Sequence, residues 1–351
     1  MVSNKPLPNF IAFGNSLVDQ SVKVPNHDIL KRYNLNPNEL GECSPEILSN
    51  IIRDVRHENL EVQVHLGGSA LNTCRLLRAI DVCYDARQTA RILFCGAIGV
   101  DDNGQFVERQ LKELDIETFL QTDPTESTGT CICLIHKEDR CCYANIGASK
   151  HFQANDKLTD KLKAIVNIQE RAVVYIEGFF LTERSQVCRS IIQQFSERNS
   201  NVTLAVNLSA PYLVENNIAD VNFLVEQADI VFGNKDEFEV LAKCNQINTV
   251  IEFVYSMSES LNANARNKII VITDGNQPIE IYTLVMNESF KWETLDVRVV
   301  KQQDVIDTTG AGDAFVAGFF HAYLRQDAIK DCVKFGMEVA VNKLKNVGAQ
   351  L

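Results

Sequence analysis

The sequence predicts an α/β fold in which helices flank a mostly parallel sheet and a small β-rich lid sits beside it. Short runs of β-branched and apolar residues recur along the 351 residues, separated by stretches of helical period. Most runs are continuously apolar, as strands buried on both faces are. Two segments instead alternate apolar and polar residues, which is typical of strands with one face in water or against a ligand. Strands alternating with helices favour a parallel sheet.

The composition is that of a globular protein and excludes several partners. Charged residues make up 23% and hydrophobic residues 45%, and 34 Lys and Arg stand against 46 Asp and Glu. A net charge of −12 without a basic stripe argues against nucleic acid or an anionic membrane as a partner. The longest apolar runs fall far short of the roughly 20 residues that a membrane span needs. We expect a monomer in the cytoplasm, with the nucleus left open as a location.

Eleven cysteines are scattered along the chain without a C-x-x-C pair. Reduced cysteines behave as small hydrophobic residues, so they indicate a reducing compartment. The nearest approach to a metal pattern is Cys131, Cys133 and His136. On a strand the two cysteines face one side and His136 faces the other. We therefore expect no metal site from these three residues.

Apolar runs predict the buried strands of the main sheet. In chain order they cover 9–15, 92–99, 172–180, 203–210, 228–234 and 268–275. Stretches with helical period lie between them, for example at 184–198 and 241–261. Because ligands bind at the carboxyl ends of parallel strands, the residues that follow these runs are the first candidates for a site.

Two alternating segments predict the lid. In residues 17–24, Val18 and Val22 share one face while Asp19 lies on the other, and residues 61–65 alternate in the same way. Between them a helix is expected to begin after Ser44, a good N-cap followed by proline. The second segment, 118–147, has two alternating strands around a turn at 137–139. We assign 17–65 and 118–147 to the lid, and 1–16, 66–117 and 148–351 to a large nucleotide-binding domain.

The strongest motif is the run Asp307-Thr-Thr-Gly-Ala-Gly-Asp313, which lies between an extended stretch and a helix. Its small residues Gly310, Ala311 and Gly312 let the first backbone amides of the helix approach an anion closely. Asp313 lies at the same place and could accept the proton of an attacking hydroxyl. The alternative is an acid that only balances the helix dipole, and the length of the run favours the catalytic interpretation.

This run resembles the C-terminal signature of the ribokinase-like carbohydrate and nucleoside kinases, and the similarity extends from Gly14 to Ala349. The resemblance implies an α/β domain with a small lid, ATP as the phosphoryl donor and Mg²⁺ as its cofactor. It also implies that Asp313 is the catalytic base and that Arg140 contacts the transferred phosphate.

Further motifs resemble the substrate side of the same family. Residues 66–72, Leu-Gly-Gly-Ser-Ala-Leu-Asn, match its glycine-pair motif, in which Gly67, Gly68 and Ser69 approach the sugar and Asn72 bonds a ribose hydroxyl. Asn15 and Asp19 leave the first strand, and Asp19 matches the family's acceptor for ribose hydroxyls. Without the resemblance, a glycine pair before a helix is more often a plain turn.

Two motifs at the carboxyl ends of predicted strands resemble the ATP-binding residues of the family. Asn234 and Glu237 fit the family's Asn-x-x-Glu pattern, which holds Mg²⁺ and the phosphates mainly through water. Thr273 and Gly275 resemble the loop beside the ATP phosphates. Read alone, Asn234 to Glu237 is equally a helix start with acids in its first turn.

Adenosine is the acceptor that the resemblance implies. Residues 178–182 and 207–211 resemble the adenosine-specific branch of the family. Phe179 or Phe180 would stack against the base, and Phe180 is the closer match. Ile146 from the lid would cover the other face. The expected reaction moves the γ-phosphoryl group of ATP to the 5′-hydroxyl of adenosine, giving AMP and ADP in purine salvage. Residues 39–43 depart from the family pattern, as does Met337, where the family has a histidine.

Other enzyme classes lack their motifs here. No G-x-x-x-x-G-K-[ST] occurs, which excludes a P-loop kinase, and no G-x-G-x-x-G follows the first strand, as a dinucleotide oxidoreductase would require. Two alternatives stay open: a ribokinase-like kinase for another nucleoside or a sugar, and a catalytically silent relative that only binds its ligand.

Overall fold

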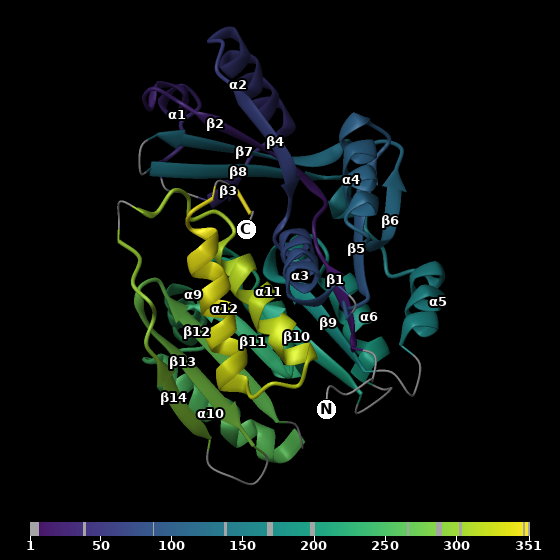
Figure 1. Cartoon of the computed structure of the whole chain (residues 1–351), viewed down its shortest axis with the longest axis vertical. Coiled ribbons are helices and arrows are strands. Elements are labelled where there is room, and N and C mark those ends of the chain that lie inside the picture. The colour runs from purple at the N-terminus through teal and green to yellow at the C-terminus, as the bar shows by residue number, and fades with distance from the viewer. Residues whose placement is uncertain are drawn as a thin grey trace.

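The chain forms two β-sheets that lie one above the other in Figure 1. This computed structural model describes residues 7–37, 40–86, 88–136, 139–166, 171–196, 201–264, 267–285, 290–301, 304–346 and 348–349. Within those residues the larger sheet has nine strands in the order β14-β13-β12-β11-β10-β9-β1-β5-β6. The smaller sheet has the order β3-β8-β7-β2-β4.

Six parallel strands form the centre of the large sheet, and they are the six that the apolar runs predict. Three of them, β1, β5 and β9, are buried along their whole length. The six are β1 (Asn9–Phe13), β5 (Ile92–Gly99), β9 (Ala172–Glu177), β10 (Val202–Asn207), β11 (Ile230–Asn234) and β12 (Lys268–Asp274). The antiparallel strands β13 (Gln277–Leu284) and β14 (Lys291–Leu295) extend one edge.

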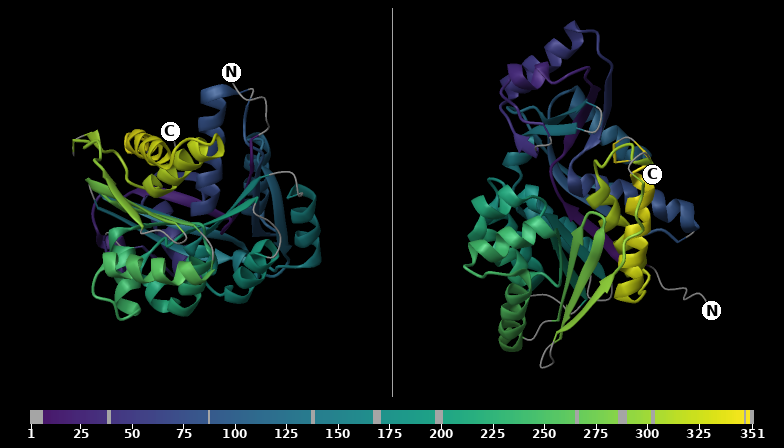
Figure 2. Two further views of the ribbon diagram at one scale, coloured as in Figure 1. Left: turned by 90° about the horizontal axis from the view of Figure 1, so that it is seen from below. Right: turned by 90° about the vertical axis from the view of Figure 1, so that its left-hand side faces the viewer.

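Helices cover both faces of this sheet, as the left view of Figure 2 shows. Alternate strand residues enter separate cores, so that Phe10 packs in one layer and Ile11 in the other. The first layer contains α3 (Ser69–Asp85), α4 (Asp102–Glu113), α11 (Ala311–Leu324) and α12 (Ile329–Lys343). The second contains α5 (Asp156–Ile165), α6 (Ser185–Ser196), α8 (Ile218–Gln227), α9 (Lys235–Cys244) and α10 (Val250–Asn264). Shorter elements are α7 (Pro211–Asn216), η1 (Ala148–His151) and η2 (Gly178–Leu181).

The small sheet carries helices on its outer face. It consists of β2 (Leu17–Lys23), β3 (Leu40–Glu42), β4 (Val62–Gly67), β7 (Thr128–His136) and β8 (Asp139–Gly147), with α1 (Asp28–Arg32) and α2 (Pro45–His57) packed against it. The expected start of α2 is confirmed, because the Ser44 hydroxyl accepts a hydrogen bond from the Ile47 amide at 3.3 Å. The turn expected at 137–139 falls mostly outside the described residues.

One strand differs from the division that the sequence suggests. β6 (Glu117–Asp123), which was assigned to the lid, pairs in parallel with β5 at the edge of the large sheet. An edge strand has one partly exposed face, so it shows the same alternation of polar and apolar residues as a lid strand. The domain boundaries themselves stay a prediction.

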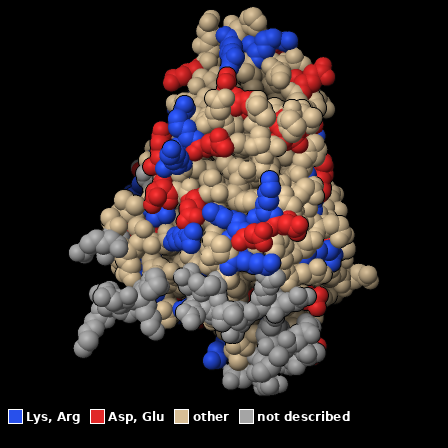
Figure 3. Space-filling model, turned by 90° about the vertical axis from the view of Figure 1, so that its right-hand side faces the viewer, with Lys and Arg blue, Asp and Glu red and all other residues tan. Residues whose placement is uncertain are grey.

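Charged side chains of both signs are mixed on the face drawn in Figure 3, where Lys and Arg lie among Asp and Glu. Among the described residues, no helix is both long enough and apolar enough to cross a membrane.

Candidate active site

A cavity of about 440 Å³ lies between the two sheets, within the size range of small-molecule sites. Its walls come from the carboxyl ends of the central strands, the start of α11 and the inner face of the small sheet. Most residues singled out in the sequence meet there: Asn15, Asp19, Gly68, Ser69, Asn72, Ile146, Asn234, Glu237, Thr273, Gly310, Ala311, Gly312 and Asp313. Because parallel strands have their carboxyl ends at one edge of the sheet, residues as far apart in the chain as Asn15 and Asp313 line the same cavity.

Asp313 lies in the first turn of α11 and is held by two donors from α3. The Ser69 hydroxyl donates to Oδ1 at 2.7 Å, and the Asn72 amide donates to Oδ2 at 3.0 Å. Burial raises the pKa of Asp313 to about 6, while these two hydrogen bonds and the charges of Lys343 and Arg75 oppose the rise. The carboxylate is therefore oriented, mostly ionised at neutral pH, and able to take up a proton.

The turn before Asp313 has a shape that requires glycine. Gly310 has φ 71°, and a Cβ there would lie 2.7 Å from Cβ of Ala349. At Gly312, by contrast, a Cβ would meet nothing within 4 Å, so the first turn of α11 faces open space. The first amides of a helix lack backbone partners and carry the positive end of its dipole. An anion can therefore approach this turn closely.

Asp307 supports this turn, a role that the sequence did not assign to it. Its Oδ1 accepts hydrogen bonds from the Thr309 amide at 2.8 Å and the Thr309 hydroxyl at 2.6 Å, and its Oδ2 accepts from the Gly348 amide at 2.7 Å. Although burial opposes them, these bonds and the Lys343 charge lower the pKa of Asp307 to about 2. Asp307 is thus a fixed anion that ties the start of α11 to the end of the chain.

Asp19 lies on β2 and faces the same cavity from the small sheet. A Cβ on Gly67 would fall 1.8 Å from Oδ1 of Asp19, so only glycine lets the carboxylate lie against β4. Gly67 thus contacts Asp19. It is not one of the residues that line the cavity. Gly68 has φ 99°, and a Cβ there would lie 2.1 Å from the Asn15 carbonyl oxygen. Burial raises the pKa of Asp19 to about 7, with Cys142 adding to the rise and Arg75 opposing it.

Two charged residues of the site were missed in the sequence. Arg75 donates to the Leu66 carbonyl at 2.9 Å and to Oδ1 of Asn72 at 3.2 Å, and its charge acts on both Asp19 and Asp313. Its position three residues after Asn72, on the same helix face, was a usable signal. Glu177 is the last residue of β9 and is fully buried. Burial raises its pKa to about 8; the negative charge of Asp313 adds to this rise, and the positive charge of Arg184 opposes it. The sequence signal for Glu177 was an acidic residue at the end of an otherwise apolar strand, because a buried charge is costly without a partner.

Of the two phenylalanines expected near the base, the closer family match, Phe180, does not line the cavity. Phe180 is fully buried, with the Arg184 guanidinium 4.4 Å from its ring centre and the Phe152 ring 5.6 Å away. Phe179 lines the cavity instead. Successive residues of the short helix η2 point in different directions, so only one of the two rings can face the cavity.

Asn234 and Glu237 form a capping box at the start of α9. Oδ1 of Asn234 accepts from the Glu237 amide at 2.8 Å, and the Glu237 carboxylate accepts from the Asn234 backbone and side-chain amides, both at 2.9 Å. Burial raises the pKa of Glu237 to about 7. Both residues line the cavity, but no group of three carboxylate, histidine or cysteine ligands forms around them within the described residues. This donor set fits a Mg²⁺ ion that keeps most of its waters, and not a protein cage.

The remaining predicted residues have mixed positions. Asn15 lines the cavity, donating to the Phe179 carbonyl at 3.1 Å and accepting from Arg184 at 2.5 Å, so it holds the loop after β9. Gly275, with φ 54°, lies in the turn after β12 and does not line the cavity. Met337 is buried in the core beside α11. The side chain of Arg140 lies outside what the structure describes.

Comparison with known sequences identifies the family. The profile described as pfkB family carbohydrate kinase matches residues 37–351. The chain is 27% identical over 346 residues to adenosine kinase of Dictyostelium discoideum, covering 96% of this chain and 94% of the relative. It is 26% identical over 333 residues to adenosine kinase 2 of Arabidopsis thaliana, covering 93% and 90%.

Solved structures share the fold. Adenosine kinase from Schistosoma mansoni in complex with adenosine in an occluded loop conformation has a TM-score of 0.82 at 22% identity, covering 99% of this chain and 98% of that one. A probable sugar kinase from Rhizobium etli CFN 42 has a TM-score of 0.75 at 18% identity, covering 99% and 96%. The resemblance to the ribokinase-like kinases is thus confirmed: the chain belongs to the pfkB family of carbohydrate kinases and is an ATP-dependent phosphotransferase with an alcohol acceptor.

Proposed function

We propose that this enzyme transfers the γ-phosphoryl group of ATP to the 5′-hydroxyl of adenosine, giving AMP and ADP. One observation carries the proposal: Asp313, held by Ser69 and Asn72 at the start of α11, lies in the same cavity as Asp19 on the small sheet. In this proposal Asp313 accepts a proton beside the turn that stabilises an anion. Asp19 accepts hydrogen bonds from a sugar.

In this mechanism Asp313 is the general base. Its pKa of about 6 leaves it ionised at neutral pH yet basic enough to take the proton of the attacking hydroxyl. The amides at 310–312 stabilise the negative charge that develops on the transferred group, which is the main contribution of a kinase site. Arg140 is proposed to contact that group as well.

Asp19 anchors the ribose in the same scheme. Its carboxylate accepts hydrogen bonds from the two ribose hydroxyls, and Arg75 keeps it partly ionised despite its burial. The small sheet then closes over the nucleoside, with 17–65 and the strands β7 and β8 (128–147) as the moving unit. Closure excludes water from the transferred phosphoryl group.

Adenine recognition is supported by the residues near the small sheet and by the relatives. Phe179 and Ile146 line the cavity and offer apolar surfaces to a planar base. The relatives from Dictyostelium discoideum and Arabidopsis thaliana, which match over 90% or more of their length, are adenosine kinases.

The magnesium ion is proposed to lie near Asn234 and Glu237, with Thr273 on the neighbouring strand beside the nucleotide phosphates. These side chains would hold it mainly through water. When bound, the ion neutralises phosphate charge and aligns the nucleotide. The monomeric state and the cytoplasmic location stay predictions.

A substrate panel tests the proposal. Initial rates with Mg²⁺ and ATP would be measured for adenosine, inosine, guanosine, ribose and fructose, with release of ADP as the common signal. We expect the highest kcat/KM for adenosine. A higher kcat/KM for another nucleoside or a sugar would reassign the substrate, and adenosine binding without ADP release would indicate the silent relative.

A further inference from the structure

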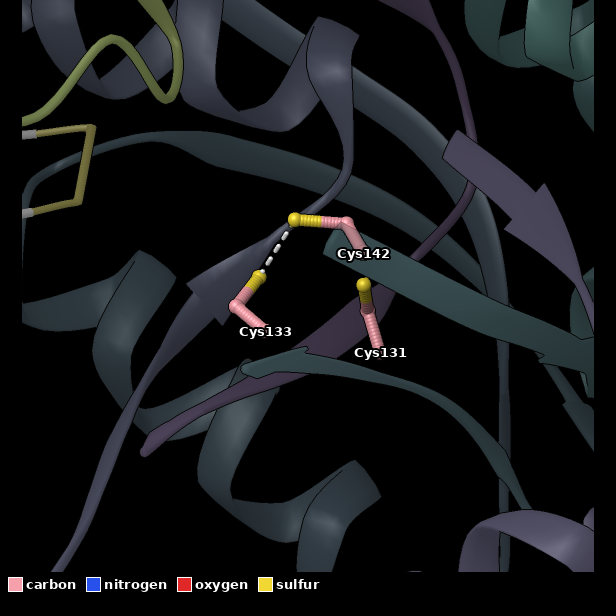
Figure 4. A group of neighbouring side chains, drawn as sticks. All are labelled: Cys131, Cys133 and Cys142. Carbon is pink, nitrogen blue, oxygen red and sulfur yellow. Dashed lines mark hydrogen bonds between the residues drawn. The ribbon is translucent and has the colours of Figure 1, made fainter. Parts of the chain in front are cut away.

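Three cysteines meet on the inner face of the small sheet. Cys131 and Cys133 lie two residues apart on β7, and Cys142 lies directly opposite Cys133 on β8 (Figure 4). Their three sulfur atoms all lie within 4.8 Å of one another, and the Sγ atoms of Cys133 and Cys142 are 2.9 Å apart. All three side chains are buried and line the cavity of the active site.

The sequence grouped Cys131 and Cys133 with His136, whereas the structure groups them with Cys142. His136 lies apart, with its Nδ1 3.0 Å from the Val24 carbonyl oxygen and its ring packed against His27 at 4.8 Å. The third sulfur comes from the neighbouring strand. The expectation that Cys131 and Cys133 share one face is confirmed, but only the pairing of β7 with β8 adds Cys142.

We propose that Cys131, Cys133 and Cys142 bind a thiophilic metal ion of the Zn²⁺ type, with the fourth coordination position open to the cavity. A tetrahedral ion with metal–sulfur bonds of about 2.3 Å separates its sulfur ligands by about 3.8 Å. The sulfur atoms already lie within 4.8 Å of one another, so the site requires only small rotations of side chains on paired strands.

The surroundings indicate an accessible site, not a closed structural one. Within the described residues, no fourth histidine, cysteine or carboxylate joins the group to complete a cage. Asp19 pairs with Cys131 in the register of β2 and β7, and it lines the same cavity. A site with three protein ligands keeps one position for water or another small ligand.

Binding exchanges protons for metal and involves no oxidation. The thiolate is the form that ligates a metal, so each S–H that binds releases its proton to solvent. Protons therefore compete with the metal for the sulfur atoms, and metal affinity decreases in acid.

Occupancy has a consequence for catalysis, and this consequence alone rests on the proposed function. An ion bound beside Asp19 would occupy the region where the ribose is proposed to lie. Zinc should therefore inhibit competitively with the nucleoside acceptor and not with ATP.

Cobalt is a spectroscopic probe for such a site. The reduced, metal-free full chain would be titrated with Co²⁺ while its absorption is recorded, and Zn²⁺ would then be added. We expect a thiolate-to-cobalt charge-transfer band and tetrahedral visible bands that saturate at one ion per chain and disappear with Zn²⁺. Cys133→Ala and Cys142→Ala should lose the bands, whereas Cys83→Ala, which removes an exposed cysteine, should keep them.

A second measurement does not depend on the variants folding. The wild-type chain would be alkylated with and without Zn²⁺, and the modified cysteines would be mapped by mass spectrometry. Slower alkylation of Cys131, Cys133 and Cys142 alone supports the site. Absent cobalt bands in the wild type, unchanged bands in both cluster variants, or a Cys133–Cys142 disulfide in protein purified without reductant would overturn it. Competition kinetics with adenosine then test the consequence separately, because metal binding without inhibition would leave the site intact.

Discussion

Asp313 combines an oriented carboxylate with a raised pKa, and both properties can be tested by one substitution. Asp313→Asn keeps the size of the side chain but cannot accept the proton, so kcat should fall by roughly 10²–10⁴. Because a base must be ionised, the wild-type kcat should fall as the pH drops through about 6, and the residual rate of the variant should lack this limb. Steady-state kinetics across pH would measure both.

The exposed Asp160 on α5 provides the matched control, since Asp160→Asn should leave the rate unchanged. An Asp313→Asn enzyme with normal folding and a rate within about threefold of wild type would remove Asp313 from the mechanism.

The proposed contact between Asp19 and the ribose can be removed either by changing Asp19 or by removing the ribose hydroxyls. Hydrogen bonds to a charged group contribute about 1.5–3 kcal/mol each, so Asp19→Ala should weaken adenosine binding by one to a few powers of ten at about 1.4 kcal/mol per decade. For 2′,3′-dideoxyadenosine the same substitution should have little effect, because the hydroxyls are already missing. Calorimetric affinities for both proteins and both ligands complete the cycle. Strictly additive losses would show that Asp19 does not contact the ribose.

At the scale of elements, the start of α9 has two possible meanings. The capping box satisfies Asn234 and Glu237 internally, which a plain helix start also needs. If the pair also holds Mg²⁺, Glu237→Gln should raise the Mg²⁺ concentration for half-maximal rate more than the KM for adenosine. Glu239→Gln, an exposed position on the same helix, is the control. An unchanged metal dependence would leave only the capping role.

The pairing of β2 with β4 sets the position of Asp19 through Gly67. In Gly67→Ala the new Cβ would fall 1.8 Å from Oδ1 of Asp19, so the carboxylate must move. We expect the KM for adenosine to rise by about tenfold or more, equivalent to about 1.4 kcal/mol. Val64→Ala changes an exposed side chain of the same strand and should have no effect. Equal KM values for the two variants would show that Asp19 is not positioned by the glycine.

At the scale of the whole molecule, the cavity concentrates carboxyl groups that are more basic than usual. The pKa values of Asp313, Asp19, Glu237 and Glu177 are raised to about 6, 7, 7 and 8, each mainly by burial. Between the unfolded values near 4 and these folded values, the folded chain binds more protons than the unfolded chain. The free energy of unfolding should therefore decrease as pH rises through this window, by up to about 1.4 kcal/mol per pH unit for each group.

Urea unfolding near pH 5 and pH 8 would measure this effect. Asp313→Asn removes one of the groups, so its stability relative to wild type should be greater at the higher pH. Asp307, whose pKa is lowered to about 2, loses its stabilising charge only in stronger acid and does not disturb the comparison. A relative stability that does not change with pH would show that Asp313 titrates as it does in the unfolded chain.

The sequence by itself determined the central strands and the places where chemistry is concentrated. Continuous apolar runs predict the six parallel strands because a strand buried on both faces cannot carry charge along its length. The run at 307–313 could be recognised because a helix start that approaches an anion requires small residues at fixed spacings, whereas the run at 66–72 was recognised only through its resemblance to the ribokinase-like kinases.

Only the tertiary structure decided which faces meet. Alternation in β6 reports a half-exposed strand without saying which sheet it joins. The choice between Phe179 and Phe180, the charge of Arg75 between two carboxylates, and the approach of Cys142 to Cys133 all depend on neighbours from other elements. Periodicity records whether a side chain is buried, whereas its partner is set by strand pairing between residues far apart in the chain, which no local pattern encodes.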